Sequence, residues 1–193
     1  MIEPDSGTPP LHPQTPLWDF SVQVYTREGV ETACLDLQDR FGLNVNMLLF
    51  AVWMGFSGRG TVGHNGIRTA LTTTLHWHAS IVEPLRRIRR LVQSLEHVAA
   101  GDVESLRRAL LHNELASERI EQEGLAHEFA APPSPERARE QGLGDAMANL
   151  SSYLDVIHVK LDANGRRALC LILHAAFPGT AQGQITRQCN RAF

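Results

Sequence analysis

The sequence predicts an all-α protein, a single-domain helical bundle of about six to seven helices. Apolar residues recur at helical spacings of three and four in several stretches, and no alternating strand pattern of useful length occurs. The composition agrees, because 43% apolar and 20% charged residues in a chain of 193 residues suit one globular core.

The two ends of the chain are predicted to lie outside this bundle. Residues 1–14 contain four prolines, which indicates a disordered leader, and residues 178–193 are expected to form a flexible tail. The helical domain then spans residues 15–177, with an internal proline-rich linker near residues 131–141.

Three helices are expected in the first third of the domain. The first follows Pro16, and the second runs from about Glu28 to Phe41 and ends at Gly42 in a left-handed conformation. Asn44 is expected to cap the third helix, residues 45–56. That helix is apolar nearly all round, so it should be the buried, central one.

Five glycines between residues 55 and 66 predict a loop after the third helix. The string from Gly58 to Gly63 matches the GxGxxG pattern of dinucleotide-binding proteins. That motif requires a preceding strand, whereas the segment here is helical, so a flexible helix–helix loop is the better interpretation.

An arginine-rich helix is predicted between residues 75 and 99. We expect Leu85, Ile88 and Leu91 or Val92 to point inward, four arginines (Arg86, Arg87, Arg89 and Arg90) to fan outward, and Pro84 to kink or break the helix. Two interpretations of the arginines stay open. They form salt links, internally or with a partner, or they bind an anion, since guanidinium groups bind carboxylates and phosphates.

The second half of the chain is expected to hold three helices. The first is long and polar, from Val103 to about Phe129, and its glutamates 114, 118 and 121 are predicted to form a solvated face. An apolar seam then runs from Leu143 to Leu161 and should pack on a neighbour, in the core or in a dimer. The last helix is expected from about Arg166 to Phe177.

No motif predicts a catalytic residue, a metal site or a cofactor. His76 and His78 are two residues apart and so point in different directions on a helix, and no Glu-x-x-His string exists. The three cysteines form no CxxC pair, and no nucleophile motif is recognisable. Whether the protein is an enzyme stays open, with the balance against it.

Charge and hydropathy favour a cytoplasmic protein that binds neither nucleic acid nor membrane. The net charge is −3 and the pI is about 6.3, so no positive field attracts polyanions. The longest apolar run, residues 47–56, is about half of the ~20 residues that a membrane-spanning helix needs. The first residues lack the basic and apolar run of a signal peptide.

Polar residues within or between the first three helices are the strongest site candidates. They either satisfy helix ends and core polar groups, or converge with tryptophans and arginines on a small pocket. The candidate binding residues are Trp18, Asp19, Gln38, Asp39, Asn44, Asn46, Trp77, Arg86, Arg89 and Arg90.

The same stretch carries a likeness to a known family. Its residues are Leu17-Trp18-Asp19-Phe20-Ser21, Tyr25, Gly29-Val30, Ala33-Cys34-Leu35, Leu37-Gln38-Asp39, Gly42-Leu43-Asn44-Val45-Asn46 and Leu48-Leu49-Phe50, followed by Trp77, Val82, Pro84-Leu85-Arg86 and Arg89-Arg90. This pattern resembles a family of uncharacterised, mostly proteobacterial proteins, known as a domain of unknown function, over roughly residues 17–130. The resemblance implies an α-helical cytoplasmic protein and brings no activity with it.

The leading functional hypothesis is therefore a non-catalytic protein-binding or regulatory module, whose partner is another protein or a second copy of the chain. The alternative is a protein or enzyme that binds a small anionic ligand. Its pocket would lie between the first three helices and the arginine-rich helix, with Arg86 or Arg89 holding the anion.

Overall fold

The computed structural model describes residues 15–94 and 100–193, and within these ranges the chain is helical with short connections and no strand. In chain order the elements are α1 (Leu17–Tyr25), α2 (Val30–Phe41), α3 (Val45–Phe56), α4 (Gly63–Trp77), a π-helical turn η1 (His78–Val82), α5 (Glu83–Gln93), α6 (Ala100–Glu128), α7 (Pro135–Val156), α8 (Ala163–Ala176) and α9 (Gln182–Ala192). The all-α class is confirmed, with more helices than predicted. The predicted leader, residues 1–14, lies outside the described residues.

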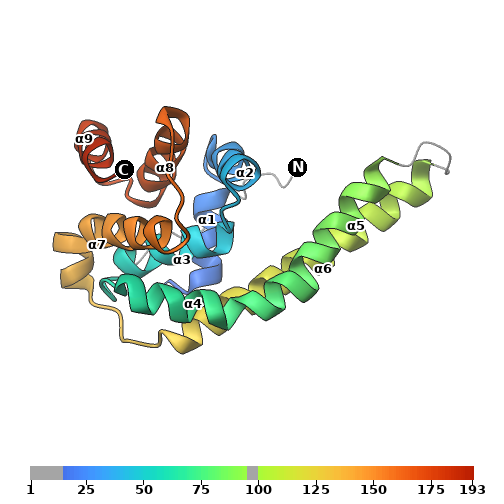
Figure 1. Ribbon diagram of the computed structural model, residues 1–193, viewed down its shortest axis with the longest axis horizontal. Coiled ribbons are helices and arrows are strands. Elements are labelled where there is room, and N and C mark those ends of the chain that lie inside the picture. Colours follow the sequence, from blue (N-terminus) through green and yellow to red (C-terminus); the bar gives the residue numbers. More distant parts are fainter. Residues whose placement is uncertain (1–14, 95–99) are drawn as a thin grey trace.

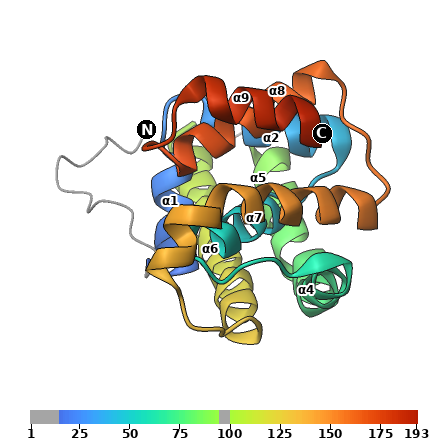
Figure 2. The same cartoon turned by 90° about the vertical axis from the view of Figure 1, so that its left-hand side faces the viewer.

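Helix α3 forms the centre of the body, as its apolar sequence predicts. Every residue from Asn46 to Gly55 is buried, and α1, α6, α7 and α8 all contact the helix (Figures 1 and 2). Its start is fixed by Asn44, whose Oδ1 accepts hydrogen bonds from the backbone N–H groups of Asn46 at 2.8 Å and Met47 at 3.2 Å. The helix before it ends at Gly42, whose φ of 67° gives the expected left-handed end.

The apolar seam of α7 packs on α3 within the same chain. Leu150 is fully buried and Leu154 is 7% exposed, and both belong to the main core. The two helices come very close where Gly55 meets the α7 backbone at Gly142 and Ala146, a position that leaves no room for a Cβ atom. The seam is therefore core, and the idea that it forms a dimer interface is wrong.

The loop predicted from the glycines is present but shorter than expected, since it covers only residues 57–62. Gly58 and Gly60 have φ values of 70° and 97°, which favour glycine. Asn149 of α7 holds the turn, since its side chain accepts a hydrogen bond from Val62 N at 2.9 Å and donates one to Gly60 O at 3.0 Å. Helix α4 already begins at Gly63, and a helix precedes the GxGxxG string, so the dinucleotide-binding context is lacking.

Two predictions about the C-terminal third are wrong. The linker near residues 131–141 ends at Ser134, because Pro135 starts α7 and Ser134 Oγ caps it. Residues 178–193 are not a flexible tail, since α9 buries Ile185 and Cys189 almost completely against the body. Only these two positions of α9 are apolar and inward, too few to stand out as a periodic pattern in the sequence.

A long helical arm projects from this body. The end of α4, η1 and α5 run antiparallel to α6, and the pair extends well beyond the other helices (Figure 1). The irregularity expected at Pro84 is present as η1, one turn earlier, while Pro84 itself sits in the first turn of α5. None of the helices in the described ranges is long and apolar enough to cross a membrane.

Candidate functional site

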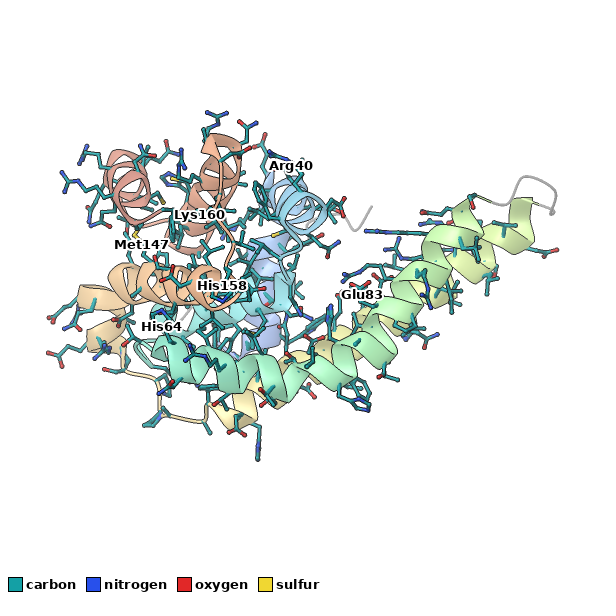
Figure 3. The ribbon with its side chains drawn as sticks, in the orientation of Figure 1. Arg40, His64, Glu83, Met147, His158 and Lys160 are labelled. Atoms are coloured by element: carbon teal, nitrogen blue, oxygen red, sulfur yellow. The ribbon has the colours of Figure 1, made fainter. Side chains whose placement is uncertain are left out.

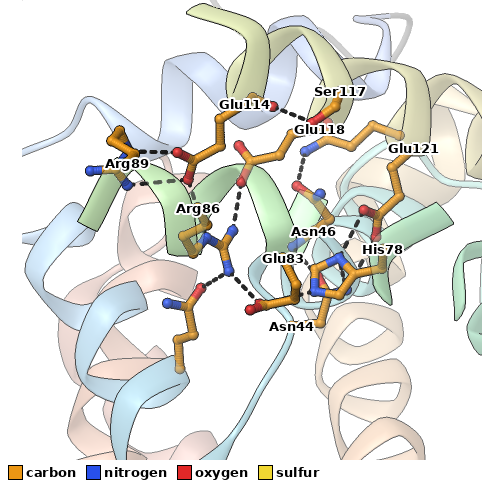
Figure 4. A network of polar contacts seen from close by, with 12 residues as sticks. Asn44, Asn46, His78, Glu83, Arg86, Arg89, Glu114, Ser117, Glu118 and Glu121 are labelled. Carbon is orange, nitrogen blue, oxygen red and sulfur yellow. Dashed lines mark hydrogen bonds and ion pairs between the residues drawn. The ribbon is translucent and has the colours of Figure 1, made fainter. Parts of the chain in front are cut away.

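Arg86 is the centre of a polar network where the arm meets the body. The side chain is buried, with 9% of the residue exposed. Its Nη1 donates to Gln38 of α2 at 2.8 Å and to Glu83 at 3.0 Å, Nη2 donates to Glu118 at 2.7 Å, and Nε donates to Glu114 at 3.2 Å (Figure 4). These contacts occupy four of the five N–H groups of a guanidinium.

Glu114 is shared by two arginines. Besides the bond from Arg86, its carboxylate accepts hydrogen bonds from Arg89 at 2.5 and 3.2 Å, and the residue is only 4% exposed. A carboxylate so deeply buried requires paired charge, because an isolated ion in the interior is strongly unfavourable. The network therefore ties α5 to α6 along their contact.

A second part of the network centres on Glu121, whose side chain is completely buried. His78 Nδ1 lies 2.9 Å from one of its oxygens, and Asn44 Nδ2 donates to the other at 3.1 Å. Burial of the His78 ring acts to lower its pKa, but the hydrogen bond and the negative charge of Glu121 outweigh that effect, so the pKa is raised. The capping residue of α3 is thus bonded to the arm.

Two further bonds fix α6 against the body and against α4. Gln122 donates to Asn46 Oδ1 at 2.8 Å in the interior, and the Trp77 indole N–H donates to the carbonyl oxygen of Ser117 at 2.9 Å. Together with the Arg86 contacts, they join α2, α3, α4, α5 and α6. The arm is therefore held rigidly at its base, and Glu83 lies at this junction (Figure 3).

The structure brings together some of the predicted site residues and leaves others apart. Gln38, Asn44, Asn46, Arg86 and Arg89 belong to the network, and Trp77 borders it. Asp39 and Arg90 form an exposed ion pair of 3.5 Å at its rim. In contrast, Trp18 is half-buried and Asp19 exposed on α1, and neither has a hydrogen bond to the network among the described residues.

Sequence reasoning missed the acidic half of the network. Glu114, Glu118 and Glu121 share one face of α6, and that face is not solvated but turned toward Arg86 and His78. Burial raises the pKa of Glu118 even though Arg86 donates to it. The pairing could have been predicted from the three acids at helical spacing on one helix and the four arginines on the neighbouring helix.

A cleft of about 590 Å³ lies beside the network, between α2, α4, α5 and the end of α7. Its polar lining includes Gln38, Asn44, His78, Glu83 and Arg86. Because the Arg86 guanidinium already donates to three carboxylates and an amide, it has little capacity left for an anion. The geometry does not support the predicted anion site at Arg86 or at Arg89, which is engaged by Glu114.

The sides of α5 differ in part from the prediction, although Val92 is buried and Arg87 and Arg90 are exposed as expected. Arg86 faces inward, whereas Ile88 and Leu91 are 44% and 60% exposed. The glutamates of α6 determine this orientation, because the inward side chains of α5 must pair with them. The apolar side of α5 is consequently left toward solvent.

This apolar side continues across α6 and defines what we call the outer face of the arm. Ile81, Leu85 and Ile88 recur at spacings of four and three on η1 and α5, and Leu106, Leu110 and Ile120 are the aliphatic residues that we include on α6. Helices α5 and α6 contact each other, so these residues belong to one helix pair. Ser80, Pro84, Ala109, Asn113 and Ala116 near them are uncharged, whereas the exposed Arg87 and Arg119 directly precede Ile88 and Ile120.

The described residues offer no group of three or more His, Cys, Asp or Glu that could hold a metal ion. Its carboxylates are held by arginine, histidine and asparagine donors. The site thus defines a class of protein: an all-α body that holds a projecting helical arm through a buried ion-pair network.

The family follows from comparison with known proteins. A family described as "Protein of unknown function (DUF2390)" matches residues 16–125, more than half of the chain, and the protein belongs to it. The match covers α1 to α5 and all but the last residues of α6. Neither the curated proteins nor the solved structures include a match to this chain.

Proposed function

We propose that this protein is a non-catalytic protein-binding module that associates through the outer face of its arm. One observation carries the proposal: four large aliphatic side chains of this face are exposed to solvent. The exposed fractions are 37% for Ile81, 44% for Ile88, 50% for Leu106 and 51% for Ile120. Exposed aliphatic side chains that gather on one helix pair are typical of an interaction surface.

The inner side of the arm supports this role by making the outer face rigid. The ion pairs of Arg86 and Arg89 hold α5 against α6, and the bonds of Asn44 and Asn46 hold α6 against the body. A surface that is ordered before binding loses less conformational entropy when a partner docks. The arm therefore presents its apolar rows in a fixed geometry.

The partner that this face fits best is a second copy of the chain. In a twofold dimer the apolar rows of this face would meet identical rows. From residue 77 to residue 92 the arm is roughly 22 Å long, and two helices 8–10 Å apart give a face about 20 Å wide. Two such faces would bury on the order of 1,000 Å², at the lower end of specific interfaces.

The test is the oligomeric state of variants, measured by sedimentation equilibrium between about 1 and 100 µM. The wild-type protein is expected to reach the mass of two chains, whereas the double variant Ile88→Glu/Ile120→Glu should remain a folded monomer. Leu171→Glu is the matched control, because Leu171 is 38% exposed on α8, outside the arm, and its replacement should leave the dimer intact.

A wild-type protein that is monomeric over the whole range would contradict the second copy as partner. So would a dimer that the double variant leaves unchanged. Circular dichroism of each variant verifies that it is folded, because the replaced side chains lie at the surface.

A further inference from the structure

A second and larger cleft lies on the body, and no residue of the arm lines it. It measures about 870 Å³, which is within the range of small-molecule sites, and lies between the end of α1, the first half of α7 and the connection from α8 to α9. Its apolar surface includes Phe56, Leu143 and Phe177, and the rings of the two phenylalanines meet edge to face with centroids 5.8 Å apart.

Two arginines of this cleft are available to a ligand. Arg27, after α1, and Arg139, on α7, both line the cleft and are exposed, and neither forms an ion pair among the described residues. The neighbouring Asp145 is already neutralised by Arg137, which donates to it at 2.8 and 3.1 Å. Glu140 is the remaining acid of the lining, so the two arginines leave the cleft with a positive balance.

We propose that this cleft binds an organic anion with an aromatic or acyl body. The guanidinium groups of Arg27 and Arg139 would hold its carboxylate, phosphate or sulfonate group. The rings of Phe56 and Phe177 would contact the apolar body. This inference is independent of the proposed dimer, since the two surfaces share no residue.

The cleft belongs largely to the part of the chain beyond the family match. Apart from Arg27 and Phe56, its lining residues lie between 138 and 188, whereas the match ends at residue 125. The helix that supplies Gln188 is α9, which the sequence did not reveal. The anion site predicted from the sequence was instead placed at the arginines of α5, which form ion pairs in the structure.

The experiment compares two fluorescent probes that differ in charge, 8-anilinonaphthalene-1-sulfonate and its neutral analogue N-phenyl-1-naphthylamine. Both are titrated into the protein carrying Ile88→Glu/Ile120→Glu, so that the outer face of the arm does not contribute. Saturable binding of the sulfonate is expected, at least tenfold tighter than that of the neutral probe. Arg27→Ala/Arg139→Ala should weaken the sulfonate at least tenfold and leave the neutral probe unchanged.

Two further variants make the result specific to the cleft. Gly144→Trp should abolish binding of both probes, because Gly144 lines the cleft and has open space where a Cβ would stand. Arg68→Ala, an exposed arginine of α4, should change nothing. The proposal is overturned if the sulfonate shows no saturable binding, or if its affinity survives either the double arginine variant or Gly144→Trp.

Discussion

At the residue scale, Arg86 is a charged side chain that is buried and held by four hydrogen-bond partners. It contacts residues of α2, α5 and α6, and its partner Glu114 is 4% exposed. A buried ion pair is weak evidence for net stability, because desolvation opposes the attraction of the charges. Removing one partner is different, since the other charge is then left in the interior.

Replacement of Arg86 by alanine should therefore lower the free energy of unfolding by about 3–5 kcal/mol. Arg90→Ala is the matched control, because the Arg90 side chain is 54% exposed and its pair with Asp39 is 3.5 Å long. For such a surface pair a change of about 0.2–1 kcal/mol is expected. Urea unfolding followed by circular dichroism measures both, and equal losses would contradict the central role of Arg86.

The pairing of His78 with Glu121 should make stability depend on pH. The folded-state pKa of His78 is raised above the unfolded value of about 6.5, so the pair contributes fully below that pH and the contribution is lost as pH rises through the folded pKa. Glu83 supports the charged ring and Arg86 opposes it. His78→Gln should thus cost more stability at about pH 6 than at about pH 9, as measured by unfolding at both pH values. A loss that is the same at both would refute the charged pair.

At the element scale, the contact between α3 and α7 depends on glycine. A Cβ at Gly55 would collide with backbone atoms of Gly142 and Ala146, which cannot move as a flexible side chain could. The same helix α7 holds Gly144, where a Cβ would meet nothing within 4 Å. The two positions form a natural pair for comparison.

Gly55→Ala is expected to destabilise the protein by about 1–3 kcal/mol or more, because it forces α3 and α7 apart. Gly144→Ala should instead stabilise it by about 0.5–1 kcal/mol, since glycine inside a helix is unfavourable relative to alanine. Thermal and urea unfolding measure the change in the free energy of unfolding of each variant. A stabilised Gly55→Ala variant would contradict the close contact between α3 and α7.

Helix α9 tests whether the C-terminal segment is part of the core. Ile185 is fully buried and packs with the main cluster, so Ile185→Ala should cost about 2–5 kcal/mol. Arg191→Ala, at an exposed position of the same helix, should change stability by less than about 0.5 kcal/mol. A flexible tail would tolerate both substitutions equally, which urea unfolding would reveal.

At the scale of the whole molecule, the body and the arm differ in how they are stabilised. The body surrounds α3 with apolar helices, whereas the arm consists of two helices held by charged pairs on one side and exposed on the other (Figures 1 and 4). Local stability follows the number of buried apolar contacts, so the parts of the arm farthest from the body should open first.

Hydrogen exchange should separate these two parts. Amides of α3 are expected to exchange only on global unfolding, while amides near the start of α6, from Val103 to Arg108, should exchange much faster at low protein concentration. If the outer face pairs with a second copy, protection of the arm should increase with concentration. Uniform protection along the chain, independent of concentration, would contradict both expectations.

Much of the fold was predictable because its signals are local. The end of α2 at Gly42, the cap of α3 at Asn44 and the burial of α3 all follow from a residue type at a given place in a helical pattern. Asn44 was also a correct candidate for a polar network, whereas Arg86 was expected to point outward. The partners of both were not predictable, since Glu121 is 77 residues from Asn44 in the sequence and Glu114 is 28 from Arg86.

The sequence by itself determined the helical class, most helix boundaries and the identity of the central helix. Only the tertiary structure decided which side of α5 faces inward. Arg86 and Arg89 point toward α6 because its buried carboxylates require charged partners more strongly than exposed aliphatic side chains require cover. The packing of α9 on the core was likewise evident only in the tertiary structure. Two buried side chains in one helix are too few to form a recognisable sequence pattern. The orientation of α5 leaves the apolar outer face of the arm exposed, and the packing of α9 forms one wall of the cleft.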